Sequence, residues 1–201
     1  MTDTPARRRT ASAEVSAALL NAAEAVLDRD GSGGITIRAV AREAAVAPMS
    51  VYNRFDHKDG LLTALAMRAL DELAEAIQSP EDEDGAERFR QACRAYRDFA
   101  LAHPARYSLI FASGTPLSDQ TSAVAGRGRA VFTVLADLIS GLPGGGAPHD
   151  PWESAQSVWS AIHGAVSIEQ VGIGQTEDAA ASFENLLDLL ITGLSRGASG
   201  P

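Results

Sequence analysis

The stretch Ile35–Phe55, ITIRAVAREAAVAPMSVYNRF, holds two short runs of helical periodicity separated by a tight turn. Thr36 is a suitable N-cap for the first run, which we expect to continue to about Ala44. Pro48 suits the first turn of the second run, because the amide hydrogen that proline lacks would be unpaired there. Two short helices joined in this way have the layout of a helix-turn-helix unit, whose second helix lies in the major groove of DNA.

The two expected helices divide their side chains between an inner and an outer face. The inner, apolar positions are Ile37, Val40, Ala41, Val46, Val51 and Phe55. The outer positions of the second helix are Met49, Ser50, Tyr52, Asn53 and Arg54. Asparagine can bond bidentately to adenine and arginine to guanine, whereas Tyr52, Ser50 and the nearby Lys58 are expected to hold phosphates. The alternative is an ordinary helical hairpin packed in a core.

Apolar residues recur at helical spacing through nearly the whole chain, and no convincing strand pattern is present. We expect a first helix that ends near residues 30–34 and a fourth helix that Asp56 caps. The buried positions of this fourth helix are expected to be Leu62, Leu65, Ala69, Leu73 and Ile77. Later helices are expected around residues 89–100, from Pro104, and over about 118–140, 151–172 and 177–196. The sequence therefore predicts an all-α fold.

The acidic segment Ser79–Gly85, SPEDEDG, is the best candidate for a domain boundary, because it combines charge with flanking Pro and Gly. The expected division is a disordered basic arm over residues 1–10, a helix-turn-helix domain over 11–60, a connecting helix over 61–78, and a helical ligand-binding and dimerisation domain over 79–201. The arm contains Arg7, Arg8 and Arg9, which are expected to contact phosphates or a minor groove. The alternative for the arm is a solvated tail.

The net charge of −9 argues against a nucleic-acid-binding protein only until it is resolved along the chain. Residues 1–68 carry 9 basic and 8 acidic side chains, a net +1, whereas the remainder carries 8 basic and 18 acidic side chains, a net −10. Screening confines such fields to about 8–10 Å, so only the charge near a contact matters for DNA binding. The asymmetry permits a near-neutral DNA-binding domain joined to an acidic domain.

Nothing in the sequence indicates export or membrane insertion. No apolar run approaches the roughly 20 residues that span a bilayer, and the N-terminal stretch lacks the apolar core of a signal peptide. The single cysteine, Cys93, has no partner for an internal disulfide, which suits a reducing interior. We expect a cytoplasmic protein with no membrane partner.

The sequence also lacks the motifs of common enzyme sites. It has no Gly-rich phosphate loop, no G-x-S-x-G and no metal-binding spacing such as H-E-x-x-H, and its four histidines are scattered. An enzyme, a metal site and a cofactor are therefore not expected. A helical interaction module without DNA binding is the remaining alternative. It is disfavoured by the polar outer face of Arg38, Ser50, Tyr52, Asn53, Arg54 and Lys58.

The stretch Leu20–Leu62 resembles the TetR family of bacterial regulators. It matches in an Ala-rich first helix, a Gly-containing link, Thr36 at the start of the second helix, and the run V-x-x-x-S-V-Y-x-x-F-x-x-K-x-x-L-L over residues 46–62. By position, the resemblance implies that Thr36 and Lys58 contact phosphates. It implies DNA-facing positions at Arg38, Pro48, Met49, Ser50, Tyr52, Asn53 and Arg54.

Ala45 departs from the family pattern, which usually has a turn glycine at this position. If the turn requires a positive φ, alanine costs roughly 1 kcal/mol there.

A weaker resemblance covers the C-terminal part of the chain. The pattern W-x-x-x-H-G over Trp159–Gly164, and HPARYSLIF over His103–Phe111, resemble the WHG type of C-terminal domain found in part of this family. The resemblance implies an all-α body with a small-molecule pocket beside a dimer interface, and repression as the usual mode of action. The residues themselves do not distinguish a repressor from an activator. Gly164 is expected to let a neighbouring helix approach closely.

The last two expected helices contain more apolar surface than one small monomer needs, which indicates a homodimer. The stripe expected to mediate it is Phe183, Leu186, Leu187, Leu190, Ile191 and Leu194. Two-fold pairing of such helices gives a four-helix interface. It would set two recognition helices about one DNA turn or more apart, so the expected partner is a double-stranded, pseudo-palindromic operator.

Aromatic residues at helical spacing suggest walls for a ligand pocket, because such pockets are apolar with a few orienting polar groups. The candidates are Tyr96, Phe99, Tyr107, Phe111, Trp159 and His163. The alternative is that these side chains simply fill the core. The expected effector is a small apolar or aromatic molecule, which would change operator affinity by binding one arrangement of the dimer better than another.

Overall fold

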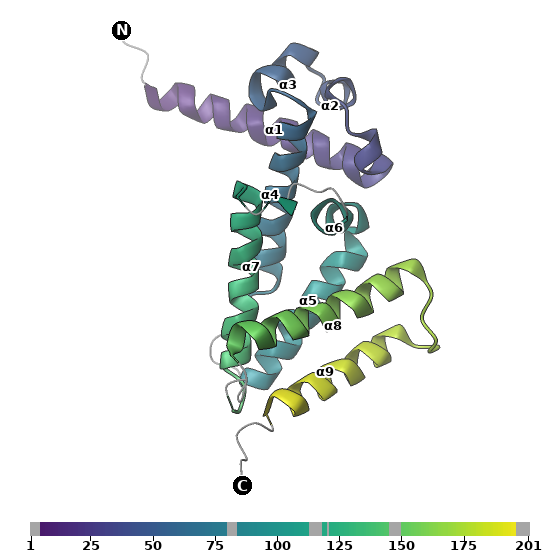
Figure 1. The fold of residues 1–201 in the computed structure, drawn as a ribbon. Coiled ribbons are helices and arrows are strands. Elements are labelled where there is room, and N and C mark those ends of the chain that lie inside the picture. The colour runs from purple at the N-terminus through teal and green to yellow at the C-terminus, as the bar shows by residue number, and fades with distance from the viewer. Residues whose placement is uncertain (1–4, 80–83, 113–117, 120, 145–149, 196–201) are drawn as a thin grey trace. The chain divides into compact units, whose positions relative to one another are not determined.

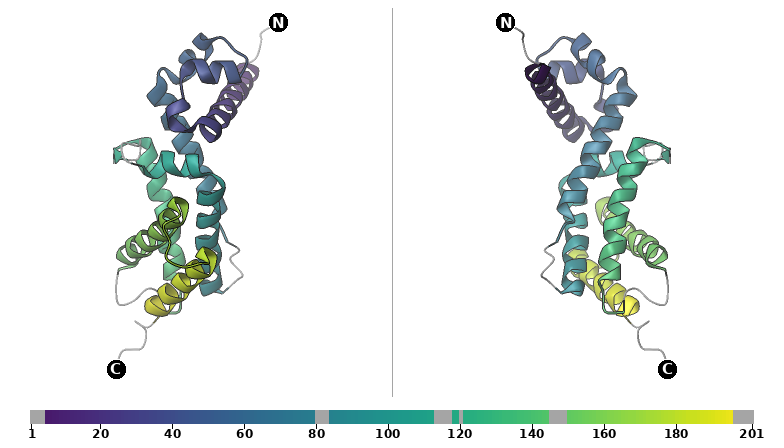
Figure 2. Two further views of the ribbon diagram at one scale, coloured as in Figure 1. Left: turned by 90° about the vertical axis from the view of Figure 1, so that its right-hand side faces the viewer. Right: turned by 90° about the vertical axis from the view of Figure 1, so that its left-hand side faces the viewer.

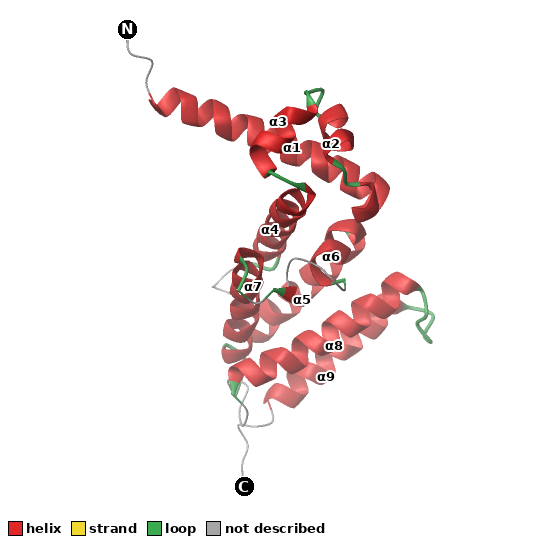
Figure 3. Cartoon of the chain, turned by 45° about the horizontal axis from the view of Figure 1, so that its top comes forward, coloured by secondary structure: helices red, strands yellow, loops and turns green. Residues whose placement is uncertain are grey.

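The computed structural model describes residues 5–79, 84–112, 118–119, 121–144 and 150–195, with side chains from residue 14 onward. Within these ranges the chain is helical and contains no strand, which confirms the predicted all-α fold (Figures 1 and 3). The helices are α1 (Pro5–Gly34), α2 (Ile37–Glu43), α3 (Pro48–Phe55), α4 (Lys58–Ala76), α5 (Gly85–Ala102), α6 (Pro104–Phe111), α7 (Ala123–Ser140), α8 (Pro151–Val171) and α9 (Ala179–Ser195).

The chain folds as two compact units that do not follow chain order. The first unit comprises residues 1–69 and 105–125, and the second comprises residues 70–104 and 126–201. The boundary therefore falls inside α4, and α6 belongs with the N-terminal helices, whereas the sequence suggests a division at Ser79–Gly85. No helix in the described part of the chain is long and apolar enough to cross a membrane.

The first unit is built on α1, against which α2 packs, with α3 packing on α2 in turn (Figure 2). Val26, Val40 and Val51, one from each of these helices, are completely buried. Full burial of a side chain of this size stabilises a fold by roughly 1.5–3 kcal/mol. Burial of these side chains therefore stabilises the packing of α1, α2 and α3.

The helix α1 begins earlier than expected and is interrupted where expected. It starts at Pro5, so Arg7–Arg9 lie in its first turns rather than in a disordered arm; proline suits the first turn, and Ala and Arg are good helix formers. The side chains of these arginines lie outside the described residues. At the other end, Gly31 adopts φ 68°, within the predicted end at residues 30–34.

The turn between α2 and α3 is closed by the backbone. Thr36 caps α2 as predicted, its Oγ1 accepting a hydrogen bond from Ala39 N at 3.0 Å. At the other end Val46 N donates to Ala41 O at 2.9 Å and Ala45 N donates to Arg42 O at 3.2 Å, the pattern of a Schellman motif. Ala45 has φ 54°, so the position does require a left-handed backbone.

The Schellman motif corrects one sequence-based assignment. Val46 was expected to face inward, but it is 38% exposed. The left-handed residue before it reverses the chain, so the helical periodicity of α2 does not continue through the turn. The inner side of α3 is supplied by Val51, which is fully buried, and by the half-buried Phe55.

The link from α3 to α4 is a second tight turn. Asp56, expected to cap α4, instead ends α3 with φ 64° and ψ −63°, and His57 N donates to Phe55 O at 2.7 Å across it, as in a γ-turn. A Cβ atom on Gly60 would overlap the carbonyl oxygen of Phe55, so only glycine fits there. The buried stripe of α4 begins at Leu61, which is fully buried, and not at the half-buried Leu62.

Ion pairs fasten α4 and α6 to α1 within the first unit. Arg68 of α4 pairs with Glu24 at 2.8 Å and also donates to Asn21 at 2.7 Å. Arg106 of α6 donates to both carboxylate oxygens of Asp28, at 3.2 and 2.7 Å. These contacts explain why α6 groups with the N-terminal helices.

In the second unit α5 packs against α8 and α9, and α8 and α9 lie side by side (Figures 1 and 3). Their shared core consists of Phe89, Ala92, Cys93, Tyr96, Ala100, Val158, Ile162, Val166, Phe183 and Leu187. Asp84 and Asp150 cap α5 and α8 through their side chains. α7 begins at Ala123 rather than near Ser118, because Ser122 Oγ accepts from Ala125 N at 3.0 Å and starts the helix there.

Ala45→Gly is expected to stabilise the protein. Glycine removes a left-handed strain of roughly 1–2 kcal/mol but adds roughly 0.4–1 kcal/mol of unfolded-state entropy. The expected net gain is up to about 1 kcal/mol, or about 2–4 °C in melting temperature for a chain of this size. Thermal unfolding followed by circular dichroism measures it. Ala44→Gly is the matched control, because Ala44 has φ −80°, and it should not stabilise. A melting temperature that rises equally in both variants would contradict the assignment of strain to Ala45.

Candidate functional site

The exposed face of α2 and α3 contains the residue types that bind DNA. α3 rests on Val51, and its other side presents Met49 and Tyr52, which are 63% and 48% exposed. Asn53 and Arg54 are also exposed, as is Arg38 on α2. One short helix thus offers an amide, a guanidinium, a phenol and an apolar side chain to solvent, which is the chemistry that reads base edges in a major groove.

Three further candidates at this face have local structural roles. Thr36 caps α2, Pro48 occupies the first turn of α3, and the half-buried Ser50 donates its backbone N–H to Ala47 O at 2.9 Å. Lys58 is exposed at the start of α4. Helix starts are suited to phosphate contacts, because their first amide hydrogens lack intrahelical partners.

The cations on this face differ from the other described cations of the first unit, because they have no carboxylate partner in the described part of the chain. Arg29, Arg68 and Arg106 are each paired with a carboxylate. In contrast, Arg38, Arg54 and Lys58 make no ion pair with any described residue. Among the side chains that the structure describes in the first unit, the unneutralised positive charge is therefore gathered on α2, α3 and the start of α4.

Arg42 joins this group, although sequence reasoning did not include it. It is exposed on α2, makes no ion pair with a described residue, and lies one turn after Arg38 on the same helix face. The available signal was its spacing of four residues from Arg38.

The six aromatic candidates for a ligand site fall into separate groups. Tyr107 and Phe111 pack edge to face in the first unit, with ring centroids 4.8 Å apart. Phe99, in the second unit, stacks with His103 at 5.4 Å. Tyr96, Trp159 and His163 form the third group, also in the second unit. No single pocket wall is therefore described for all six.

Tyr96, Trp159 and His163 form a hydrogen-bonded chain. Trp159 Nε1 donates to Tyr96 Oη at 3.3 Å, and Tyr96 Oη lies 3.2 Å from His163 Nδ1. Trp159 and His163 are four residues apart on α8, which places their rings on one side, 5.8 Å apart. The W-x-x-x-H spacing thus brings two polar rings to one tyrosine of α5.

Two aromatic residues that sequence reasoning missed extend this group. Phe132 of α7 lies 6.3 Å from Trp159 and 5.0 Å from Trp152, measured between ring centroids. Trp152 is 46% exposed, so the row runs from solvent towards Tyr96. Both tryptophans of the chain belong to it. The spacing of seven residues between Trp152 and Trp159 was the signal available in the sequence.

Burial lowers the pKa of His163. The neutral ring is therefore favoured, and its Nδ1 lies within hydrogen-bonding distance of Tyr96 Oη, with the donor of this bond set by the tautomer of the ring. Tyr96 Oη accepts from Trp159 Nε1, and a hydroxyl can accept and donate at once.

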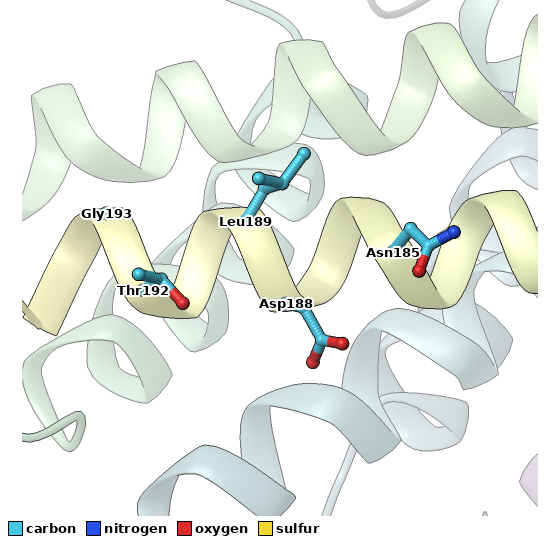
Figure 4. A pocket seen from close by; sticks show the side chains of 5 residues that line it. All are labelled: Asn185, Asp188, Leu189, Thr192 and Gly193. Carbon is cyan, nitrogen blue, oxygen red and sulfur yellow. The ribbon is translucent and has the colours of Figure 1, made fainter.

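The expected dimerisation stripe divides between the interior and the surface of α9. Phe183 and Leu187 are buried within the protomer, whereas Leu186, Leu190, Ile191 and Leu194 are half-buried. Leu189, which the sequence stripe did not include, is 72% exposed. It lines an open groove with Asn185, Asp188, Thr192 and Gly193, and Figure 4 shows Leu189 and Asp188 pointing in opposite directions from α9.

Gly164 has no close neighbour in the described protomer. A Cβ atom built on it meets no described atom within 4 Å, so the expected close approach of a helix of the same chain is not found.

Cys93 is unsuited to nucleophilic chemistry. Its thiol is buried, and this burial raises its pKa to about 12, so the thiolate is scarcely populated at neutral pH.

Two family descriptions match most of the chain. Residues 19–65 match bacterial regulatory proteins of the tetR family, and residues 89–190 match the tetracyclin repressor-like C-terminal domain. The HTH-type transcriptional regulator Rv0681 of Mycobacterium tuberculosis is 31% identical over 179 residues, which cover 85% of this chain and 77% of the relative.

Solved structures agree with these matches. A protein from Rhodococcus sp. RHA1 superposes with a TM-score of 0.78 at 25% identity and covers 90% of this chain and 95% of its own. BioQ, solved with its natural double-stranded DNA operator, superposes with a TM-score of 0.63 at 27% identity, covering 88% and 95%. A crystal structure of Mycobacterium smegmatis BioQ superposes with a TM-score of 0.65 at 27% identity, covering 89% of this chain and 97% of that chain. The chain therefore belongs to the TetR family of bacterial transcriptional regulators, which bind DNA and are not enzymes.

Proposed function

We propose that this regulator is a homodimeric repressor that binds a pseudo-palindromic, double-stranded operator and is released by a small apolar or aromatic effector. The observation that carries the proposal is the face of α2 and α3, where exposed cations without carboxylate partners among the described residues surround Tyr52 and Asn53. An interaction module that no longer binds DNA would have no reason to keep these charges unneutralised.

Base reading is assigned to the middle of α3 and phosphate binding to its surroundings. Asn53 and Arg54 are suited to bidentate contacts with adenine and guanine, and Met49 to a thymine methyl group. Thr36, Ser50, Tyr52 and Lys58 are assigned to phosphates, together with Arg38 and Arg42. Arg7–Arg9 are proposed as further phosphate contacts from the first turns of α1.

Dimerisation is assigned to α8 and α9. Their exposed apolar side chains and those of the following turn are Trp152, Ile168, Val171, Ile173 and Leu189. Apolar side chains exposed this far on two adjacent helices are typical of a surface that another subunit covers. Pairing the same two helices from each subunit gives an isologous four-helix interface, with Leu186, Leu190, Ile191 and Leu194 at its margin.

The effector site is assigned to the aromatic row of Trp152, Phe132 and Trp159 and to the polar group of Tyr96 and His163 at its end. Aromatic walls with a few orienting polar atoms are typical of small-molecule sites. Phe99, Tyr107 and Phe111 are retained as secondary candidates. No metal or other cofactor is proposed.

Release from DNA follows from a difference in effector affinity between two arrangements of the dimer. An effector that binds one arrangement better shifts the population towards it, and by linkage the operator and the effector weaken each other's binding by the same factor. Because the operator of a bacterium lies in its cytoplasm, we expect the dimer to act there.

The DNA-binding assignment is tested by fluorescence anisotropy with labelled DNA from upstream of the regulator's own gene, at two salt concentrations. The wild type should bind one palindromic segment tightly and lose affinity as salt rises. Asn53→Ala and Arg54→Ala should each cost about 1–3 kcal/mol of binding free energy and relax sequence preference. Lys58→Ala should weaken binding to all sequences and lower the salt slope by about 1.

Arg129→Ala is the control for that experiment, because Arg129 is an exposed cation of the second unit. Its binding should match the wild type. If the wild type bound no segment of the promoter region, the palindromic one included, more tightly than it binds random DNA, this result would contradict operator recognition.

The dimer assignment is tested with Leu189→Asp. A carboxylate at this exposed position would be desolvated in the interface but not in the monomer, so the dimer dissociation constant should rise at least tenfold while the helix content measured by circular dichroism stays the same. Sedimentation velocity over a concentration series measures the constant. Val15→Asp is the control, because Val15 is 53% exposed on α1. Unchanged sedimentation of Leu189→Asp would place the interface elsewhere.

His163 is expected to make stability depend on pH. Its lowered pKa means that the unfolded chain takes up a proton at a higher pH than the native protein does, so unfolding is favoured as pH falls below about 6.5. Above that pH His163 does not destabilise the native protein through protonation, because its ring is neutral in both the native and the unfolded state. Urea midpoints at pH 7.5 and 5.5 should therefore differ more for the wild type than for His163→Gln. His57→Gln, at an exposed ring, is the control and should behave as the wild type. An equal pH dependence in wild type and His163→Gln would refute the assignment.

A further inference from the structure

Three arginines of α5 lie on one face and point to acidic residues of the two helices beside it. Arg90, Arg94 and Arg97 are spaced by four and three residues, so they share a side of the helix. Their partners are Asp188 and Glu184 of α9 and Glu169 of α8. We call these three pairs the arginine ladder.

Two pairs of the ladder are bidentate. Arg94 Nε and Nη2 donate to the two carboxylate oxygens of Glu184 at 2.7 and 2.8 Å. Arg97 Nε and Nη2 donate in the same way to Glu169, at 2.8 and 2.5 Å. Two parallel hydrogen bonds fix the direction of approach as well as the distance, which a single contact does not.

The apolar packing of α9 comes from two buried side chains, Phe183 and Leu187, and from the half-buried Leu186, Leu190, Ile191 and Leu194. The guanidinium of Arg97 lies 5.7 Å from the centre of the Phe183 ring, so the ladder also contacts this apolar anchor. The charged pairs therefore add direction to the apolar packing of α9.

The order of the pairs specifies one register. Moving four residues along α5, from Arg90 to Arg94, moves four residues back along α9, from Asp188 to Glu184, as antiparallel packing requires. A slip of one turn in one direction would bring Asp188 to Arg94 and leave Arg90 opposite Thr192. A slip in the other direction would bring Glu184 to Arg90 and leave Arg94 opposite Ala180. Each slip loses one ion pair.

We infer that Arg90 and Arg94 set the register of α9 on α5, and so position the α9 groove for a second copy of this chain. The inference rests on the homodimer proposed above and makes both arginines positioning residues. The groove residues Asn185, Leu189 and Thr192 share α9 with Glu184 and Asp188. A helix one turn out of register would present these side chains about 5.4 Å away from their place in the interface.

The ion pair between Arg94 and Glu184 stays charged at neutral pH. The hydrogen bonds from Arg94 hold the pKa of Glu184 below its usual range. The positive charges of Arg90 and Arg97 also lower the pKa of Glu184. Arg94 has a second, longer ion pair, to Glu87 at 3.4 Å. The ladder thus remains ionised at neutral pH.

The test is a double-mutant cycle read by dimerisation. Arg94→Gln and Glu184→Gln remove the charge with little change in volume, and each should raise the dimer dissociation constant at least fivefold by sedimentation velocity. The double variant should stay within twofold of either single variant, because all three lose the same pair. Arg88→Gln is the matched control: Arg88 is on α5 but its recorded contact is to Ser79 Oγ, at 3.4 Å, and not to α9.

The outcomes separate this inference from the proposal beneath it. A wild type that stays monomeric at all concentrations would overturn the homodimer, and the inference with it. A dimeric wild type whose Arg94→Gln and Glu184→Gln variants dimerise within twofold of it would overturn the inference alone. Circular dichroism confirms that each variant is folded. If Arg94→Gln is not, Arg94→Lys takes its place, since it keeps the charge but loses the two-point contact, and it should weaken the dimer too.

Discussion

The hydrogen bond from Val46 N to Ala41 O is the constraint on which the DNA-binding face depends. It closes the turn that ends α2 and forces Ala45 into a left-handed backbone, at φ 54°. The chain then starts α3 at Pro48 in a direction that buries Val51 against the first unit. Once Val51 is inside, Asn53, two positions further along α3, lies on the opposite side of the helix. The outward placement of Asn53 is thus a consequence of the backbone turn, and Arg54 is exposed beside it.

Charge is allocated differently in the two units, and this explains how a chain of net charge −9 presents a cationic surface. In the first unit, Arg68 and Arg106 neutralise carboxylates of α1, which joins helices but leaves little local field. The cations on α2 and α3 have no such partners among the described residues. In the second unit the arginines of α5 are paired with Asp188, Glu184 and Glu169. Screening limits fields to about 8–10 Å, so the charge close to a contact matters more for DNA binding than the net charge of the whole chain.

The starts of α2 and α3 and the exposure of Asn53 and Arg54 could be predicted from the sequence, because they depend on local chemistry. Thr36 and Pro48 mark helix starts by side-chain capping and a missing amide hydrogen, wherever the rest of the chain lies. Periodicity also predicts a buried stripe, but it does not say what covers it. Phe183 and Leu187 are covered by their own protomer, whereas Leu189 is exposed, and the pattern of α9 alone does not separate them. Similarly, the spacing of Trp159 and His163 predicts a shared face, but their partner Tyr96 comes from a helix more than sixty residues earlier. Val46 was misplaced because the periodicity was extended through a turn that interrupts it.

The helix α5 joins two features that the sequence keeps apart. Tyr96 lies between Arg94 and Arg97, so the tyrosine that receives Trp159 and His163 sits on the same two turns as the clamps on α8 and α9. A shift of these turns by an effector at Tyr96 would therefore move the donors of the bidentate pairs, whose geometry tolerates little displacement. The fork of an arginine and a carboxylate loses both hydrogen bonds when rotated, so such a shift would weaken the contacts that hold α9. Coupling of this kind requires an element with two discrete arrangements that both sites bias, and the order of charges on α5 and α9 favours the paired register over either one-turn slip.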